Sequence, residues 1–180
     1  VLIQVGGLGV TSVGVGLILA AGKRVGIRGR KLAMEALNVD SFGGIVKLVR
    51  AILKMTLFFE VTGAVLCFPV FQQDFSPVHA LGISVFHSIA AFNNSGFDIL
   101  GGMRNLIPYQ SNVLLNLTTA ALIIFGGIGF LVILDVLKQR RFKKLTLHSK
   151  VVITTSAVLT VAGTLLFKAT EEITWLGAFF

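Results

Sequence analysis

Charged side chains are scarce in this sequence of 180 residues: they make up 13% of it, whereas 54% of the residues are hydrophobic. An average soluble domain carries about 25% charged residues. So few charges cannot cover the surface of a soluble domain, and the high hydrophobicity excludes a disordered chain. Acidic residues are the rarest, with 8 Asp and Glu against 16 Lys and Arg. In so apolar a chain, the resulting net charge of +8 indicates membrane topology, and we expect no nucleic-acid partner.

Cysteine is almost absent, which excludes an intramolecular disulfide. The single Cys67 lies in an apolar run and is interpreted as a small buried hydrophobic residue. The sequence starts at Val1 within an apolar stretch, with no charged region before it, so a signal peptide is not indicated. Its other end, Trp175 to Phe180, is also apolar, and we therefore expect a fragment of a longer protein.

Apolar stretches dominate what is present, and most are long enough to form transmembrane helices, which need about 20 residues. Each such stretch contains at most one acidic residue in its interior. The sequence predicts membrane spans over Val1 to Gly22, Met55 to Phe71, Ser111 to Leu137 (as one long helix) and Val151 to Phe167.

One further apolar stretch, Leu81 to Phe92, is too short to cross a bilayer, and runs of this length are typical of re-entrant segments. Pro77 precedes it, as expected near the start of a helix. The poor helix formers Asn93-Asn94-Ser95-Gly96 follow it. The pattern predicts a half-helix that dips into the membrane, followed by non-helical backbone that returns to the same side.

Basic residues concentrate in the two segments that follow the first and third predicted spans, whereas the re-entrant region holds only Arg104. The positive-inside rule places both basic segments in the cytoplasm and the re-entrant region outside, which predicts a multi-pass protein of the cell membrane. Within the first basic segment, residues 30–37 (RKLAMEAL) favour a short interfacial helix. The basic side chains could contact lipid headgroups or, alternatively, a cytoplasmic partner.

A short glycine pattern occurs twice, as QVGGLGV at residues 4–10 and as IFGGIGF at residues 124–130. Both copies lie in spans predicted to run from outside to inside, which indicates duplication about an axis along the membrane normal. Glycine also permits close helix packing in membranes, and we expect that role at Gly6, Gly7, Gly9, Gly126, Gly127 and Gly129.

The chemistry of the chain should lie in the return segment after the half-helix. Non-helical backbone at membrane depth is tolerated only where it is buried in protein or lines a water-filled cavity. Its carbonyl oxygens could then coordinate a cation, and the C-terminal end of the half-helix dipole would favour positive charge nearby. Gly96 would allow the required backbone angles. Asp74 and Asp98 would lie at the outer mouth and attract cations, although Asp98 could equally be a solvated loop residue.

Four motifs carry a specific resemblance: IQVGGLGV, FHSIAAFNNSGFD from Phe86 to Asp98, FGGIGFLVILD from Phe125 to Asp135, and KLTLHSKVV from Lys144 to Val152. In this order and spacing they resemble the Ktr/Trk/HKT superfamily of potassium transporters, in particular its KtrB-like membrane subunits. The resemblance implies an all-α membrane protein built from span–pore helix–span repeats, arranged with pseudo-fourfold symmetry as in potassium channels.

The resemblance also implies a division of the chain and a set of functional residues. Residues 1–44 would hold the inner helix of one repeat and a basic linker, residues 45–137 one complete repeat, and residues 138–180 a second linker and the outer helix of the next. Selectivity-filter residues would bind potassium, with Asp98 at the outer mouth and no other metal site. These filter residues would be Asn93, Asn94, Ser95, Gly96 and Phe97.

The function implied is potassium uptake through a channel-like pore, without enzymatic activity and without a cofactor in this chain, with sodium or proton coupling left open. Family members typically form homodimers in the bilayer that dock on a cytoplasmic ring of nucleotide-binding regulatory subunits. The alternative is a secondary transporter of another cation or a small solute, for which Glu60 is the candidate coupling group at a midplane site.

Three other polar residues have structural interpretations. Glu60 is expected to be a protonated or hydrogen-bonded packing residue against the half-helix, through His87 or Ser88. A lone His makes a poor metal site, so His87 is interpreted as a packing residue. Asp135 is expected to pair with Lys138 or Arg140. No motif links these residues, and an intramembrane enzyme is therefore disfavoured.

Overall fold

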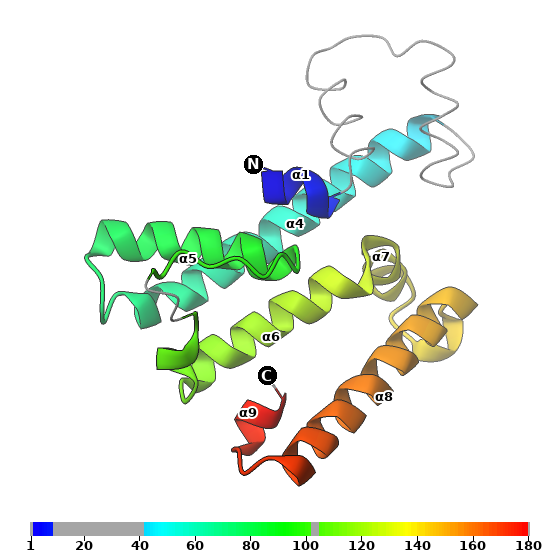
Figure 1. Cartoon of the computed structure of the whole chain (residues 1–180). Helices are drawn as coiled ribbons and strands as arrows, with labels where there is room; N and C mark the ends of the chain where they lie inside the picture. The colour runs from blue at the N-terminus through cyan, green and yellow to red at the C-terminus, as the bar shows by residue number, and fades with distance from the viewer. Residues whose placement is uncertain (1, 9–41, 102–104, 180) are drawn as a thin grey trace. The chain divides into compact units, whose positions relative to one another are not determined.

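The computed structural model describes residues 2–8, 42–101 and 105–179 (Figure 1). The predicted interfacial helix at residues 30–37, most of the predicted span Val1 to Gly22, and Gly9 lie outside the described residues. The chain forms two compact units, Val1–Phe59 and Glu60–Phe180.

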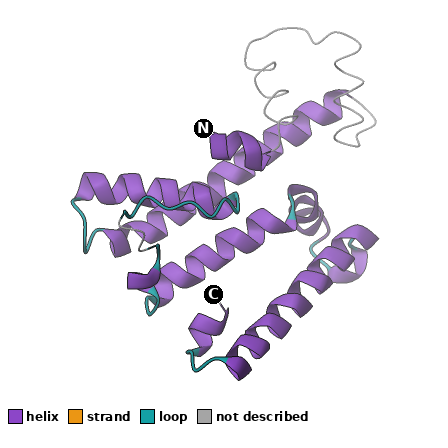
Figure 2. Ribbon diagram, viewed as in Figure 1, coloured by secondary structure: helices purple, strands orange, loops and turns teal. Residues whose placement is uncertain are grey.

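Regular structure in the described part of the chain is entirely helical, as the predicted all-α fold class requires (Figure 2). In order, the helices are α1 (Leu2–Leu8), α4 (Phe42–Phe71), α5 (Pro77–Phe92), the 3₁₀ helix η1 (Ile107–Tyr109), α6 (Val113–Ile128), α7 (Phe130–Gln139), the 3₁₀ helix η2 (Phe142–Lys144), α8 (Leu147–Thr170) and α9 (Trp175–Phe179).

Among the described residues, two single helices are long and apolar enough to cross a membrane, and both were predicted as spans; α6 and α7 make a third if that bent pair is one span. The stretch Lys47–Phe71 of α4 has 25 residues and contains the predicted span Met55 to Phe71. α8 has 24 residues and contains the predicted span Val151 to Phe167. At 1.5 Å per residue, each helix exceeds the roughly 30 Å thickness of the hydrocarbon core.

The predicted half-helix is present as α5, an apolar helix of 16 residues. It begins four residues earlier than predicted because Pro77 occupies its first turn, where the missing N–H and the fixed φ of proline are favourable. It ends at Phe92, directly before the asparagines that were predicted to stop it. Its entry into the membrane as a re-entrant segment stays a prediction.

The prediction of one continuous helix from Ser111 to Leu137 was wrong. α6 and α7 are separated at Gly129 and bent by 94°. Gly129 has φ 93° and ψ 142°, backbone angles essentially restricted to glycine. This glycine therefore causes the break, although it lies within an apolar run that hydrophobicity alone predicts as one helix.

The connection from α7 to α8 is stabilised by Asp135. One of its carboxylate oxygens accepts hydrogen bonds from the Thr146 backbone N–H (2.9 Å), the Thr146 hydroxyl (2.9 Å) and the Ser149 hydroxyl (2.6 Å). Thr146 in turn caps α8 by accepting from the Ser149 N–H. Asp135 therefore stabilises the N-terminus of the next helix, whereas its expected pairing with Lys138 or Arg140 stays a prediction.

The apolar core of the second unit lies where the C-terminal end of α4 meets the start of α5 and α6. Its buried members are Cys67, Val70, Phe71, Ala80, Ile83 and Leu115. Phe71 packs edge-on against the rings of both His87 and Tyr109, at centroid distances of 5.7 and 5.4 Å. Cys67 is fully buried, as predicted. This core fixes the direction in which α5 leaves α4.

Candidate functional site: the segment after helix α5

The return segment begins with a tight helix C-cap. The Ser95 N–H donates to the Ala90 carbonyl (3.0 Å) and the Asn94 N–H to the Ala91 carbonyl (3.1 Å). These two bonds form a Schellman motif, in which the residue after the cap adopts left-handed angles. Asn94 fills that position with φ 52°, a conformation that Asn tolerates better than most residues. The chain therefore turns back sharply at Asn94.

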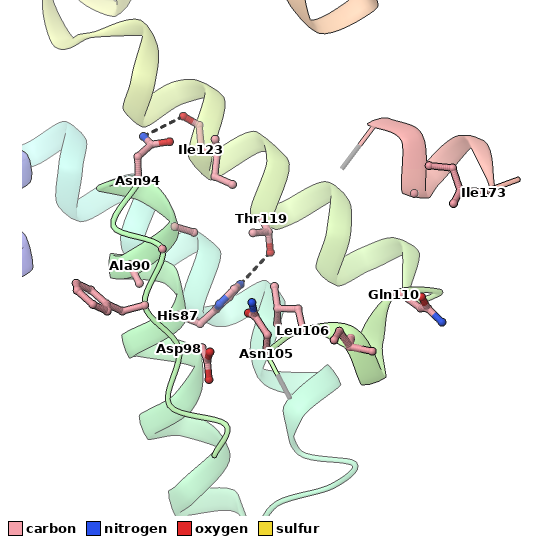
Figure 3. A pocket seen from close by; sticks show the side chains of 15 residues that line it. His87, Ala90, Asn94, Asp98, Asn105, Leu106, Gln110, Thr119, Ile123 and Ile173 are labelled. Carbon is pink, nitrogen blue, oxygen red and sulfur yellow. Dashed lines mark hydrogen bonds between the residues drawn. The ribbon is translucent and has the colours of Figure 1, made fainter. Parts of the chain in front are cut away.

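Beyond this turn the backbone is non-helical and runs back along α5 (Figures 1 and 3). Gly96 has φ 70° and no atoms within 4 Å of the position that a Cβ would occupy. The carbonyls of Ser95, Gly96 and Phe97 accept no hydrogen bond from the described residues. Gly96 and Asp98 are exposed, and so is 63% of Phe97. The segment thus presents backbone oxygens whose ligand positions are open.

α4 holds the end of α5 through Glu60. The buried Ser88 hydroxyl donates to the Glu60 backbone carbonyl (2.7 Å). The Asn93 side-chain amide donates to a Glu60 carboxylate oxygen (3.2 Å) and to the Ile89 carbonyl (2.8 Å). Ser88 therefore contacts Glu60, as expected, but at its backbone carbonyl, whereas the carboxylate accepts from Asn93.

α6 approaches the same point from another side. A Cβ added at Gly126 would collide with the Phe92 carbonyl, so α6 reaches the last turn of α5 only because residue 126 has no side chain. Gly127 also faces this region, with the Asn94 Nδ2 at 3.7 Å from its Cβ position. The Asn94 amide donates to the Ile123 carbonyl (3.3 Å), which adds a polar contact between the return segment and α6 (Figure 3).

The glycines of the repeated pattern do not all have such neighbours. Apart from neighbours along the chain, a Cβ built at Gly6 in α1 or at Gly129 would meet none of the described residues within 4 Å. Gly129 instead supplies the bend between α6 and α7. The packing role expected for the whole pattern stays a prediction, for which Gly126 offers direct structural support.

His87 bridges α5 and α6. Its Nε2 lies 2.9 Å from the Thr119 hydroxyl oxygen, and that hydroxyl donates to the Leu115 carbonyl (2.8 Å). When Nε2 carries the imidazole proton, it donates to the Thr119 oxygen, whose own proton is used on Leu115. Both side chains are buried, in agreement with the packing role predicted for His87.

A pocket of about 610 Å³ lies beside the return segment (Figure 3). Gly96, Phe97 and Asp98 line one side, and residues of α6 and α9, including Thr119 and Gly177, line others. Asp98 also accepts a hydrogen bond from the Leu100 N–H (3.0 Å), which orders the segment locally.

Asp74, the second predicted acidic residue of the outer mouth, lies in the turn between α4 and α5. It accepts a hydrogen bond from the Tyr109 hydroxyl (2.7 Å). Burial, together with this bond, raises the pKa of Tyr109 to about 12. The contact ties the α4–α5 turn to η1.

Sequence reasoning missed Thr119 and the close approach at Gly63. A Cβ at Gly63 would collide with the Ser88 hydroxyl and lie 2.7 Å from Leu122. No local signal marks Thr119, because a threonine inside an apolar helix also fits simple helix packing. Glycine in a membrane helix does signal close packing, so Gly63 could have been considered.

The chain is similar to known proteins over most of its length. Residues 1–171 match the TrkH family, described as cation transport protein. The chain is 40% identical over 171 residues to the potassium/sodium uptake protein NtpJ of Enterococcus hirae, covering 95% of this chain and 38% of that protein. It is 37% identical over 173 residues to the Ktr system potassium uptake protein B of Bacillus subtilis, covering 96% of this chain and 37% of that protein.

A third relative is the Ktr system potassium uptake protein B of Vibrio alginolyticus, 32% identical over 193 residues that cover 99% of this chain and 42% of that protein. The chain thus spans about two fifths of the length of these relatives. The family match and the apolar helices α4 and α8 make the chain a multi-pass protein of the cell membrane. With a match over nearly its whole length, the chain belongs to the TrkH family of cation transport proteins.

Proposed function

We propose that the full-length protein takes up potassium across the cell membrane through a channel-like pore, and that this chain supplies one of its filter segments. Relatives named as potassium or potassium/sodium uptake proteins support cation uptake. In this proposal residues 45–137 form one repeat of the pore, between parts of the preceding repeat in residues 1–44 and of the next in residues 138–180.

The observation that carries the filter proposal is the backbone from Ser95 to Phe97. Its carbonyls accept no hydrogen bond from the described residues, and Gly96 at φ 70° breaks the regular course of the chain. Carbonyl oxygens at this point could replace part of the hydration shell of a potassium ion. The C-terminal end of α5 adds the negative end of its helix dipole, which also favours a cation.

The partners follow from the family resemblance. We expect the full-length subunit to form a homodimer and to dock on a cytoplasmic ring of nucleotide-binding subunits. The coupling ion is open, because the relatives include both potassium and potassium/sodium uptake proteins.

Replacing Gly96 with alanine in the full-length protein tests the filter. The space around Gly96 is open, so the substitution acts through the backbone: left-handed angles cost a non-glycine residue about 1–2 kcal/mol. We expect loss of potassium uptake, or of its preference over sodium, in cells that lack other potassium uptake systems, with unchanged amounts of protein in the membrane.

Gly82→Ala is the matched control. Gly82 lies within α5, its Cβ position is equally open, and its φ is not positive. This variant should transport normally. Wild-type uptake and selectivity in Gly96→Ala would refute a filter at this glycine.

A further inference from the structure

The end of α5 is held by a side chain of α4 and a backbone carbonyl of α6, at a point three residues before Gly96. Glu60 of α4 contacts the Asn93 amide, and Asn94 contacts the Ile123 carbonyl of α6. Both asparagine amides therefore point into protein. Although the sequence placed both among the ion-binding residues, their side chains are engaged in fixing the backbone.

Glu60 is well placed to act on the filter because its contacts involve both its backbone and its side chain. The Ser88 hydroxyl donates to the Glu60 backbone carbonyl at 2.7 Å. Both residues are buried, with Glu60 8% exposed and Ser88 fully enclosed. A buried carboxylate is costly unless hydrogen-bond donors satisfy it, so Glu60 holds its position tightly. Asn93 is the cap residue of α5, and its amide links the carboxylate to the helix end.

The Schellman turn attaches the return segment to the end of α5, so the position of Asn93 determines where that segment begins. Asn94 and Ser95 are bonded to the last turn of α5 through their backbone N–H groups, and the Ser95 hydroxyl also donates to the Ala90 carbonyl (3.2 Å). Only Asn94 and Ser95, both hydrogen-bonded to the last turn of α5, separate Asn93 from Gly96. A shift or rotation of the Asn93 cap therefore moves the carbonyls of Ser95 and Gly96 directly.

We propose that Glu60 and Asn93 form a positioning pair that sets the geometry of the carbonyls around Gly96, and hence the preference of the pore for potassium over sodium. Neither side chain contacts the ion; the pair acts through the helix end. This inference rests on the proposed potassium uptake function and names residues that determine its specificity.

A double-mutant cycle in the full-length protein tests the pair. Glu60→Leu, Asn93→Leu and their combination are compared by the ratio of potassium to sodium uptake, normalised to the amount of protein in the membrane. A lost buried hydrogen bond is typically equivalent to about tenfold in an equilibrium. We expect each single variant to lower the ratio about tenfold, and the double variant to be no worse than either.

Two further variants distinguish positioning from packing. Glu60→Gln keeps a side-chain oxygen that can accept from Asn93, and we expect a ratio within about twofold of wild type. Val65→Ala, at an exposed position in α4, controls for any change in that helix and should leave the ratio unchanged. Additive losses in the double-mutant cycle, or wild-type ratios in both leucine variants, would overturn the proposal.

Should a leucine variant fail to reach the membrane, Asn93→Asp and its combination with Glu60→Gln carry the test. Asn93→Asp places a second carboxylate against Glu60 and should lower the ratio. Adding Glu60→Gln gives an amide at residue 60 and a carboxylate at residue 93, so a hydrogen bond can form again. The ratio of potassium to sodium uptake should then recover. No loss in the single variant, or no recovery in the combination, contradicts the pair. If the wild-type protein moves no potassium, the proposed function itself fails, and this inference falls with it.

Discussion

Replacing Gly126 with alanine should force α6 away from the end of α5. The added methyl group would collide with the Phe92 carbonyl oxygen, a backbone atom of the last turn of α5. A side chain could rotate away from such a contact, but a helical carbonyl moves only with its helix. We therefore expect a loss of stability and a displaced return segment, and potassium uptake should fall as a consequence.

The loss of folding free energy caused by the collision at residue 126 can be isolated by comparison with Gly127→Ala. At residue 127 the new methyl group would meet only the Asn94 amide at 3.7 Å, an ordinary van der Waals contact. Both positions lie within α6, so each alanine gains the same helix propensity, at most about 1 kcal/mol. That gain cancels in the difference, which leaves the overpacking penalty of about 1–3 kcal/mol.

The assay is denaturant unfolding of the purified full-length protein in detergent, together with potassium uptake in cells. Gly126→Ala should have a free energy of unfolding about 1–3 kcal/mol below that of Gly127→Ala, which should match or exceed wild type. Equal stability and equal uptake in the two variants would refute the argument that close contact between α6 and α5 depends on this glycine.

Two other predictions concern the connections outside the α5–α6 contact. Asp135→Ala removes the acceptor for the Thr146 backbone N–H and hydroxyl at the start of α8. It should lower the thermal unfolding temperature clearly more than Lys138→Ala does. A larger effect of Lys138→Ala would instead favour an ion pair as the main role of Asp135. Tyr109→Phe removes the hydrogen bond to Asp74 and should lower stability near neutral pH. Because the folded pKa of Tyr109 is raised to about 12, its contribution is present below pH 10 and lost as pH rises towards 12. The stability difference between wild type and Tyr109→Phe should shrink over that pH range, and a constant difference would contradict it.

The two long spans could be predicted because length and hydrophobicity suffice to define them. α4 and α8 contain the predicted spans, and their polar flanks are visible in the sequence. The stop of α5 was also predictable, since Asn93 and Asn94 are poor helix formers. The left-handed angles of Asn94 could have been anticipated as well, because Asn often takes the place of glycine at helix C-termini.

The bend at Gly129 was not predictable from hydrophobicity. A charge-free run of this length fits one helix or two, and glycine inside a membrane helix is common. The position of Asp135 next to Thr146 depends on this bend, because α7 must leave α6 at a steep angle before the chain turns into α8. Counting nearby charges therefore suggested Lys138 and Arg140, whereas the folded chain brings a helix N-terminus to the carboxylate.

The contacts that hold the return segment were beyond sequence reasoning for a different reason. Glu60 and Asn93 are separated by 33 residues, and Asn94 and Ile123 by 29. Each of these residues has an ordinary local explanation, as a packing carboxylate, a helix terminator or an apolar helix residue. Their joint role arises only because glycine allows α6 to approach the end of α5 where Glu60 of α4 already binds. In the proposed filter, free carbonyls would not hold their own geometry, so its precision would come from the surrounding helices, and residues that never touch the ion would then determine which ion passes.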